Sequence, residues 1–240
     1  MHGLILAGGE GARLSADGID VPKPLVRLGG EPLVVRLLVL LASLGCETLT
    51  CMVRADFTAV FGLLGGQEFG RPLEVRPCLT PSSMHTLAEG LQAVPPGPVF
   101  CTMVDTVMPA ANWRDVYAAT ARGLAEGADA MLAVTPFVDD ESPVYISTDG
   151  AGFVLAVGDD PLPLAPVRVT GGVYGFSTAA RQAAAEAVGQ GVQRMRGFLK
   201  WLVARGSRVG TITVPRIIDI DHESDLRLAN AWLGSPEALG

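Results

Sequence analysis

The feature of this sequence that most constrains its fold is a series of short, continuous apolar runs bounded by glycine or polar residues. Residues 3–7 run into Gly8-Gly9, and residues 99–104 run into Asp105. Apolar runs of this length without alternation are typical of strands buried on both faces of a parallel sheet. We therefore predict an α/β fold with a mixed, mostly parallel sheet flanked by helices.

Helical segments alternate with the strands up to about residue 135, after which short strands become more frequent. The predicted helices are residues 32–44, 55–64, 84–93, 112–126, 179–188, 195–204 and 223–233. The predicted strands are residues 3–7, 47–53, 73–76, 99–104, 130–135, 144–147, 153–157, 167–176, 209–214 and 217–220. Asp149-Gly150 lies between two of these strands and indicates a hairpin. With no internal repeat or low-complexity linker, we expect one domain spanning residues 1–240.

Composition excludes several classes of protein. Hydrophobic residues make up 49% of the chain and charged residues 18%, which excludes a disordered chain. The net charge of −7 argues against a nucleic-acid partner, because such surfaces need clustered Lys and Arg. Without a signal peptide pattern or a membrane-length apolar stretch, we expect a soluble, cytoplasmic protein with no membrane partner. The four cysteines have no C-x-x-C spacing, and Cys51 and Cys101 lie inside apolar runs, so we expect reduced, buried thiols at these two positions.

The segment after the first strand has the composition of a phosphate-binding loop. Residues 8–24 are predicted to form a long loop with four glycines, of which Gly8, Gly9 and Gly11 come first. Glycine lets backbone amides approach phosphate oxygens closely. Arg13 offers a forked donor, and Lys23 is a point charge held between two prolines. Because the chain has sixteen Arg and only two Lys, a lysine at this point needs a specific reason.

Two other glycine-rich loops do not fit these residues. A dinucleotide-binding G-x-G-x-x-G needs glycine at position 14, which is Leu14 here. A Walker A loop needs Gly-Lys followed by Ser or Thr, and the sequence contains no such triplet.

The motif Leu6-Ala7-Gly8-Gly9-x-Gly11-x-Arg13-Leu14, followed by Pro22-Lys23-Pro24-Leu25, resembles the signature of a known family. These are the nucleotidyltransferases that make NDP-sugars, CDP-choline and related activated metabolites. The resemblance extends over nearly the whole chain, to Asp105, residues 171–176 and the acidic C-terminal segment. It implies a Rossmann-like, GT-A-like fold of the nucleotide-diphospho-sugar transferase type. It also implies Mg²⁺-dependent chemistry, with Leu6 and Ala7 among the nucleotide-binding residues.

Carboxylates that follow strands are the predicted ligands for Mg²⁺. Asp105 ends the apolar run at residues 99–104, at the edge where α/β sheets bind ligands. Asn112 is the predicted cap of the next helix, so Asp105 is free for this role. The second ligand comes from Ile218-Asp219-Ile220-Asp221, where strand alternation points both acids to one face. The resemblance favours Asp219, and Asp221 remains an alternative as a ligand or as the cap of the last helix. Asp225 is predicted to act on the helix dipole.

By the same resemblance, residues 81–87 lie beside the nucleobase and residues 171–176 beside the acceptor. Hydroxyls of Ser82, Ser83 and Thr86 either read the base or cap the following helix, and both interpretations stay open. Gly172 and Tyr174 are candidate acceptor-binding residues. The Glu-x-Lys-Pro motif of sugar-1-phosphate enzymes is replaced by Gly158-Asp159-Asp160-Pro161. Arg168 is the predicted substitute for the missing lysine.

The combined interpretation is a Mg²⁺-dependent nucleotidylyltransferase that joins an NTP to a small phosphorylated metabolite and releases pyrophosphate. Residues of about 1–135 form the predicted nucleotide-binding half, and about 136–240 the acceptor-binding half with the C-terminal helix. Arg13 and Lys23 are the predicted catalytic residues. The alternatives are guanylyl transfer to molybdopterin and a nucleotide-binding regulatory module without catalysis. The nucleobase, the acceptor and the oligomeric state are left unspecified.

Overall fold

A nine-stranded mixed sheet forms the centre of the chain in the computed structural model, which describes residues 1–139, 141–162 and 166–235. Four neighbouring strands at one end of the sheet are parallel to one another. Its strands are β1 (His2–Ala7), β4 (Leu49–Arg54), β5 (Leu73–Cys78) and β6 (Val99–Met103). β1 lies between β4 and β6 and is parallel to both, and β4 also pairs with β5. All six residues of β1 are buried, which accounts for its continuous apolar run.

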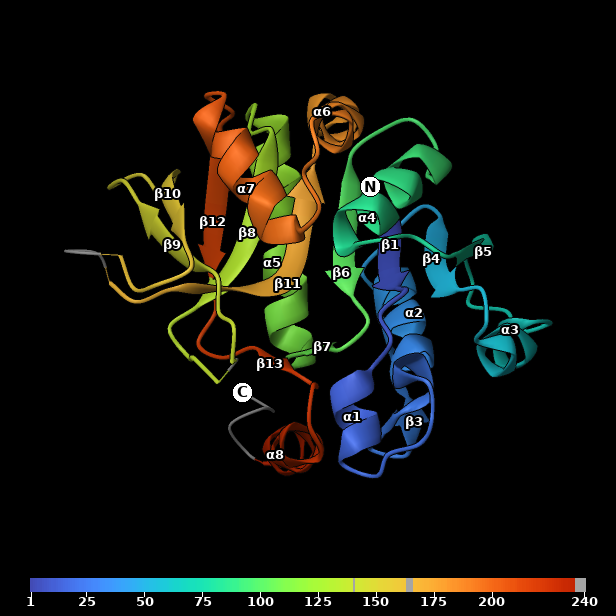
Figure 1. The fold of residues 1–240 in the computed structure, drawn as a ribbon. Helices are drawn as coiled ribbons and strands as arrows, with labels where there is room; N and C mark the ends of the chain where they lie inside the picture. Colours follow the sequence, from blue (N-terminus) through green and yellow to red (C-terminus); the bar gives the residue numbers. More distant parts are fainter. Residues whose placement is uncertain (140, 163–165, 236–240) are drawn as a thin grey trace.

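The other side of the sheet is mixed. It contains β8 (Ala130–Thr135), β9 (Tyr145–Thr148), β10 (Val154–Gly158), β11 (Val169–Phe176) and β12 (Val209–Thr213). β11 is antiparallel to both β6 and β8, and β12 is parallel to β8. β9 and β10 form the predicted hairpin. Because β11 is inserted between β6 and β8, the two halves of the sequence share one sheet (Figure 1).

Helices cover both faces of the sheet and enclose two hydrophobic clusters. Helices α2 (Leu33–Ser43), α3 (Thr58–Leu64), α5 (Ala110–Ala125) and α8 (Glu223–Leu233) contribute to one face. The other face is covered by α4 (Ser83–Ala93), α6 (Thr178–Gly189) and α7 (Met195–Ala204). Successive residues of β1 divide between the clusters, with Ile5 in the first and Leu4 and Leu6 in the second. The result is a three-layer α/β/α arrangement (Figure 1).

All four cysteines are buried and free, which the apolar runs around Cys51 and Cys101 predicted for those two. No helix in the described ranges has both the length and the hydropathy needed to cross a bilayer. These helices are amphipathic or bury one face on the sheet, as the two clusters require.

Three local expectations are wrong, for identifiable reasons. The predicted loop 8–24 contains a helix, α1 (Ala12–Ala16), and a 3-10 turn, η1 (Lys23–Leu25). Helix α5 begins at Ala110 after Pro109, so Asn112 lies inside its first turn and caps nothing. The predicted strand 217–220 is shortened to β13 (Ile218–Asp219) because its partner, β7 (Thr106–Val107), has only two residues. A further ribbon pairs β2 (Arg27–Leu28) with β3 (Glu31–Pro32).

Arg181, on α6, binds the free carbonyls at the C-terminal end of the neighbouring helix α4. Its guanidinium donates to the carbonyls of Leu91, Val94, Pro95 and Gly97 at 2.6–3.1 Å. Carbonyls at the end of a helix have no partner within that helix, and a cation there also offsets the helix dipole. One side chain thus attaches the end of α4, and the loop that leads from it to β6, to helix α6.

We predict that Arg181→Met lowers the free energy of unfolding by about 2–4 kcal/mol, because several carbonyls lose a charged donor. Urea denaturation measures this change. The matched control is Arg76→Met, which breaks an exposed pair with Glu74 at 3.0 Å and is expected to change stability by about 0.5 kcal/mol or less. Equal effects of the two substitutions would contradict this role for Arg181.

Candidate active site

Lys23 lies at the centre of the site, in contact with acids from two distant parts of the chain. Its ammonium donates to Oδ2 of Asp105 and, at 2.6 Å, to Oδ1 of Asp221. The Lys23 side chain is only 9% exposed. The backbone is fixed by Pro22 and Pro24 on either side, within the 3-10 turn η1. Gly11, at φ +68°, packs so close that an added Cβ would lie 3.3 Å from the Lys23 Cβ.

Asp105 lies two residues after the end of β6, near the strand end that the sequence predicted, and one of its oxygens has no hydrogen-bond partner among the described residues. Oδ2 accepts from Lys23, while Oδ1 is buried without a hydrogen bond in the described part of the chain. The Asp105 carbonyl accepts from the amide of Ile220 at 3.1 Å, which ties the C-terminal segment to this strand end. Burying a carboxylate oxygen without a hydrogen-bond donor is energetically unfavourable unless a cation or a water molecule binds to it.

The short pairing of β13 with β7 delivers the C-terminal acids to this point, although not by the predicted strand alternation. Asp219 pairs with Thr106 in the register, and its Oδ1 accepts from the Thr106 hydroxyl at 3.1 Å. Asp221 lies beyond the end of β13 and points to Lys23 and Arg13. Both acids line one cavity with Asp105, but Asp221 is the one that shares Lys23 with it.

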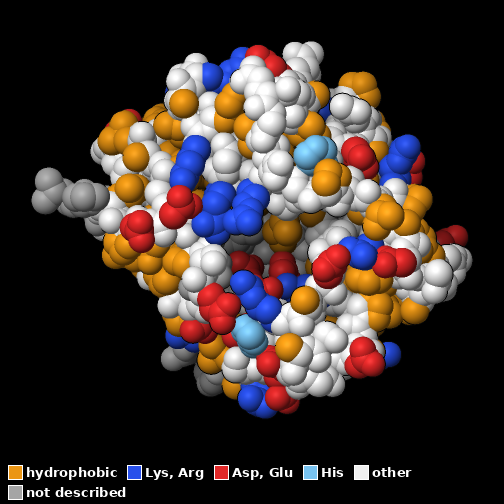
Figure 2. All heavy atoms as spheres, in the orientation of Figure 1, with side chains coloured by type: hydrophobic (Ala, Val, Ile, Leu, Met, Phe, Trp, Pro, Cys, Tyr) orange, Lys and Arg blue, Asp and Glu red, His pale blue; other side chains and the backbone are white. Residues whose placement is uncertain are grey.

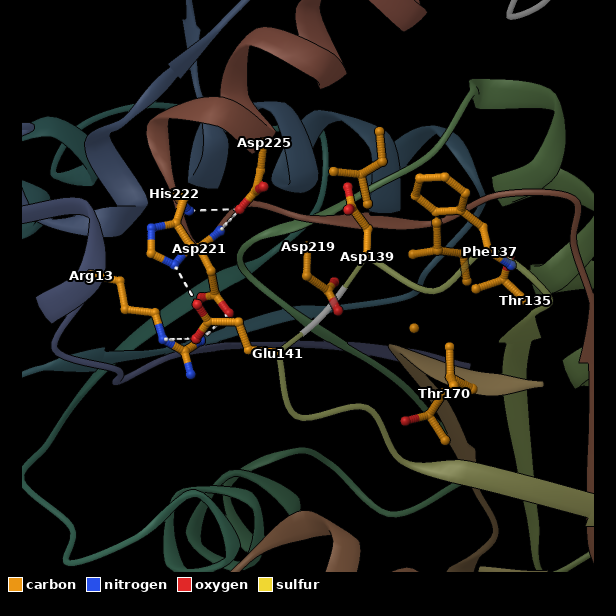
Figure 3. Close-up of a pocket in the computed structure, with 14 residues that line it drawn as sticks. Arg13, Thr135, Phe137, Asp139, Glu141, Thr170, Asp219, Asp221, His222 and Asp225 are labelled. Atoms are coloured by element: carbon orange, nitrogen blue, oxygen red, sulfur yellow. Dashed lines mark hydrogen bonds and ion pairs between the residues drawn. The ribbon is translucent and has the colours of Figure 1, made fainter. Parts of the chain in front are cut away.

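Arg13, on α1, is ion-paired on two sides. Its guanidinium is 2.6 Å from Oδ2 of Asp221, and its Nε is 3.4 Å from Oε2 of Glu141. Figure 3 shows Arg13, Glu141 and Asp221 pointing toward one another from three separate segments. The Arg13 side chain is 43% exposed, so it is available to a ligand at the surface of the site.

A second cluster fixes the start of α8 against α1. His222 is the N-cap of α8, and Asp225 accepts from the backbone amides of Asp221 and His222 at 2.9 and 2.6 Å (Figure 3). Asp225 therefore caps the helix through these two amides, and it lies in the first turn, where the sequence analysis expected it to act on the helix dipole. Nδ1 of His222 is 2.9 Å from Oδ2 of Asp17. Asp221 is therefore held by its backbone and is not itself the cap.

The charges in the site fix the protonation of its members. Burial alone would lower the pKa of Lys23, but the Asp105 and Asp221 carboxylates outweigh burial and raise it. Burial would raise the pKa of Asp221, but Lys23 and Arg13 outweigh it and lower that pKa. The site therefore holds a charged ammonium and a charged carboxylate in contact at neutral pH.

Three cavities meet at these residues. One of about 370 Å³ is lined by Gly9, Gly11, Arg13, Lys23, Asp105 and Asp221. A second, of about 380 Å³, is lined by Leu6, Gly8, Arg54 and the 80–86 segment. A third, of about 520 Å³, lies beside β11 and shares Asp105 and Asp221 with the first. Met103 lines all three, so they form one branched cleft.

The predicted base-binding hydroxyls line the second cavity, and none of them caps α4 in the usual way. Ser82 occupies the N-cap position, but its hydroxyl bonds to Nδ1 of His85 at 2.8 Å. The Thr86 hydroxyl bonds to that of Thr80 at 2.5 Å, and the Ser83 hydroxyl accepts from the Met195 amide at 3.4 Å. In contrast, the side chain of Ala7 packs in the core, which leaves only its backbone to face a nucleotide.

The third cavity has a basic rim that the sequence analysis missed. Gly172 and Tyr174, the candidate acceptor-binding residues, line this cavity, but Arg168 bonds to the Thr148 hydroxyl at 3.2 Å and is not among the lining residues. Arg194 and Arg196 line it instead, at the start of α7. Figure 2 shows Lys and Arg gathered above the central hollow and acidic side chains within it. Cations are disfavoured at a helix N-terminus, so two arginines there were a usable signal.

Gly172 brings β11 past the acids. Its φ of +70° suits glycine alone, and an added Cβ would lie 2.3 Å from the Thr106 hydroxyl oxygen. Any side chain here would displace β7, which carries the pairing that positions Asp219. The glycine is therefore required by the backbone of the site.

Comparisons with known proteins identify the family of the chain. The family model of the MobA-like NTP transferase domain matches residues 3–205. The chain belongs to this family. It is accordingly a nucleotidyltransferase, with the nucleotide-diphospho-sugar transferase fold that the N-terminal motif implied.

Individual relatives agree in fold and differ in substrate. A structure assigned as a glucose-1-phosphate thymidylyltransferase from Bacillus anthracis, in complex with sucrose, has a TM-score of 0.81 at 19% identity, covering 97% of this chain and 94% of that one. The inositol-1-phosphate CTP transferase from T. maritima has a TM-score of 0.73 at 17% identity, covering 98% and 96%. A mannose-1-phosphate guanyltransferase from Pichia angusta is 37% identical over 68 residues, which is 28% of this chain and 19% of that protein.

The residues present suit a divalent cation of the magnesium type. Asp105 and Asp221 supply hard carboxylate oxygens, and the buried Oδ1 of Asp105 has no other partner. No group of three or more His, Cys, Asp or Glu residues in the described ranges forms a metal cage. Two carboxylates with the remaining positions filled by phosphate and water is the usual arrangement for Mg²⁺.

We predict a pH-dependent contribution from the pair of His222 and Asp17. Hydrogen bonding to Asp17 raises the pKa of His222, and bonds from Glu223 and His222 lower the pKa of Asp17. Stability from the pair is therefore present between about pH 4 and about pH 6.5 and is lost as pH rises through the raised pKa of His222. The difference in unfolding free energy between the wild type and His222→Gln should shrink from pH 6 to pH 8. In an Asp17→Asn background, a pH trend of the same size would contradict the assignment.

Proposed function

We propose that this protein is a Mg²⁺-dependent nucleotidylyltransferase that joins an NTP to a small phosphorylated metabolite and releases pyrophosphate. The observation that carries the proposal is the meeting of Lys23, Asp105 and Asp221 where three branches of one cleft join. Family membership supports the nucleotidyl chemistry, and the cleft geometry supports two substrates. We further propose that the whole chain acts as one domain, with the triphosphate bound mainly by residues before 136 and the acceptor mainly by later ones.

Each branch of the cleft suits one part of the reaction. The branch beside Gly9, Gly11 and Arg13 offers backbone amides and a guanidinium for the triphosphate. The branch lined by Ser82, Ser83 and Thr86 offers hydroxyls from the start of α4 to the base. The branch beside Gly172 and Tyr174 is the largest and leaves room for the acceptor.

Transfer needs positioning and charge compensation more than covalent help from the protein. Lys23 offsets charge on the α-phosphate, and Arg13 holds the phosphates that leave as pyrophosphate. Asp105 and Asp221 would hold Mg²⁺, which when bound neutralises phosphate charge during transfer. The acceptor phosphate is already anionic, so an oxygen of that group attacks without a general base.

Asp221 is preferred to Asp219 as the partner of Asp105. Asp221 and Asp105 already share one cation, whereas the Oδ1 of Asp219 accepts from Thr106. We predict that Asp105→Asn and Asp221→Asn each lower kcat by about 10²-fold or more, and that Asp219→Asn lowers it less. Steady-state pyrophosphate release measures this ranking. A larger loss in Asp219→Asn than in Asp221→Asn would reverse the assignment.

Arg194 is the proposed cation for the acceptor phosphate. It lines the acceptor branch, and its side chain makes no hydrogen bond or ion pair with the residues that the structure describes. Arg196, in contrast, is held by Asp159 at 3.0 Å and by the Ser142 carbonyl at 2.8 Å. We predict that Arg194→Met raises the acceptor KM by about tenfold while leaving the KM for the NTP unchanged. The matched control is Arg168→Met, and a larger acceptor effect there would show that the original expectation for Arg168 was right.

The choice of acceptor needs a screen. The relatives are named for mannose 1-phosphate, glucose 1-phosphate and inositol 1-phosphate, which favours a sugar or polyol phosphate. Molybdopterin, the alternative acceptor from the sequence analysis, is the second candidate. Pyrophosphate release from four NTPs, each with sugar 1-phosphates, inositol phosphate, phosphocholine and molybdopterin in Mg²⁺, tests the proposal. Nucleotide binding without pyrophosphate release in every pair would contradict it and favour the regulatory alternative.

A further inference from the structure

Lys23 occupies the position between the two carboxylates that the proposed function gives to the metal. Its ammonium contacts Oδ2 of Asp105 and Oδ1 of Asp221, and Arg13 is 2.6 Å from the other oxygen of Asp221. Three of the four carboxylate oxygens are therefore already bound to cationic side chains. The fourth, Oδ1 of Asp105, is buried without a partner in the described ranges.

A divalent cation and the ammonium cannot share these oxygens in their present arrangement. Mg²⁺ requires carboxylate oxygens at about 2.0–2.1 Å with little distortion, and two cations this close repel each other in a partly buried site. A free metal ion arriving at the site would gain one unpaired oxygen and would have to displace Lys23 to gain more. Binding of the metal alone is therefore weakened by the side chain that later serves the phosphates.

The Lys23 ammonium can move while the Lys23 backbone stays in place. Its backbone and Cβ are fixed by the flanking prolines and by Gly11, whereas the ammonium is carried on a flexible four-carbon stem. The triphosphate branch, about 370 Å³, is lined by both Lys23 and Arg13. A triphosphate there offers both cations new anionic partners, which compensates for the loss of Asp105 and Asp221.

We propose that Lys23 is the resident counter-cation of the nucleotide-free site and excludes a free divalent ion until a triphosphate draws the ammonium away. The metal then binds together with the nucleotide, after or with it, and not before it. This inference rests on the proposed function, because it assumes that Asp105 and Asp221 are the metal ligands. It assigns Lys23 a positioning role in the empty enzyme in addition to its role toward phosphate.

Mn²⁺ binding to the nucleotide-free protein, followed by electron paramagnetic resonance, tests the inference without measuring turnover. We expect Lys23→Met to bind one Mn²⁺ about tenfold more tightly than the wild type, since the competing charge is gone. The wild type should reach similar affinity only when a non-hydrolysable NTP is added. Lys200→Met is the matched control, because Lys200 pairs with the exposed Asp159 at 2.6 Å, and it should behave as the wild type.

Two further variants keep the test decisive. Asp105→Asn in the Lys23→Met background should abolish the gain, which locates the Mn²⁺ at this carboxylate pair. Lys23→Gln keeps a neutral donor and serves if Lys23→Met does not fold, and Mn²⁺ should raise its thermal midpoint more than that of the wild type. Unchanged or weaker Mn²⁺ binding in both Lys23 variants overturns the inference.

The outcome is separable from that of the proposed function. Pyrophosphate release by the wild type, with no gain of Mn²⁺ affinity in the Lys23 variants, leaves the function standing and removes the counter-cation role. Tighter Mn²⁺ binding in those variants, with no pyrophosphate release from any substrate pair, supports the counter-cation role of Lys23 and contradicts the proposed function.

Discussion

The ion pairing of Lys23 with Asp105 and Asp221 is the interaction on which the rest of the site depends. Lys23 and Asp105 are mostly buried, and burying either charge alone would be strongly unfavourable; Asp221 completes the pairing from the more exposed side. The pairing therefore holds three segments in one place: the η1 turn, the end of β6 and the residues after β13. Arg13 extends this cluster to α1, so the glycine-rich loop is anchored to the C-terminal acids before any ligand arrives.

The pairing of β13 with β7 brings the C-terminal acids to Lys23, and Gly172 leaves room for that pairing. β13 reaches Asp105 by pairing with only two residues of β7, and the amide of Ile220 completes the attachment. β11 passes beside this ribbon at Gly172, where no side chain fits against Thr106. The order of the strands also matters. Because β11 lies between β6 and β8, the acceptor branch opens beside Asp105, just after the end of β6.

The sequence was sufficient for what local pattern determines. Helices 195–204 and 223–233 were predicted with the bounds that the structure has, because apolar periodicity specifies them. The position of Asp105 at a strand end followed from the same logic. The arrangement of Asp219 and Asp221 could not be predicted in this way. The sequence analysis assumed an extended strand through residue 221, but β13 ends at Asp219 because its partner β7 has only two residues. Arg168 was predicted because it lies near the missing motif in the sequence, and Arg194 was not considered, because nearness in sequence does not show which helix start faces the cavity.

The identity of residue 23 follows from the same geometry. In a chain with sixteen arginines, a lysine stands at the one position where a cation must hold two carboxylates in the empty enzyme and release them in the loaded one. A guanidinium would bind carboxylates in a rigid, bidentate fork and would give them up less readily. An ammonium is compact, and it can exchange one set of oxygens for another while its backbone stays fixed between two prolines. Arg13, which is more exposed and closer to the surface of the cleft, has no such constraint, and there the fork is an advantage for binding phosphate.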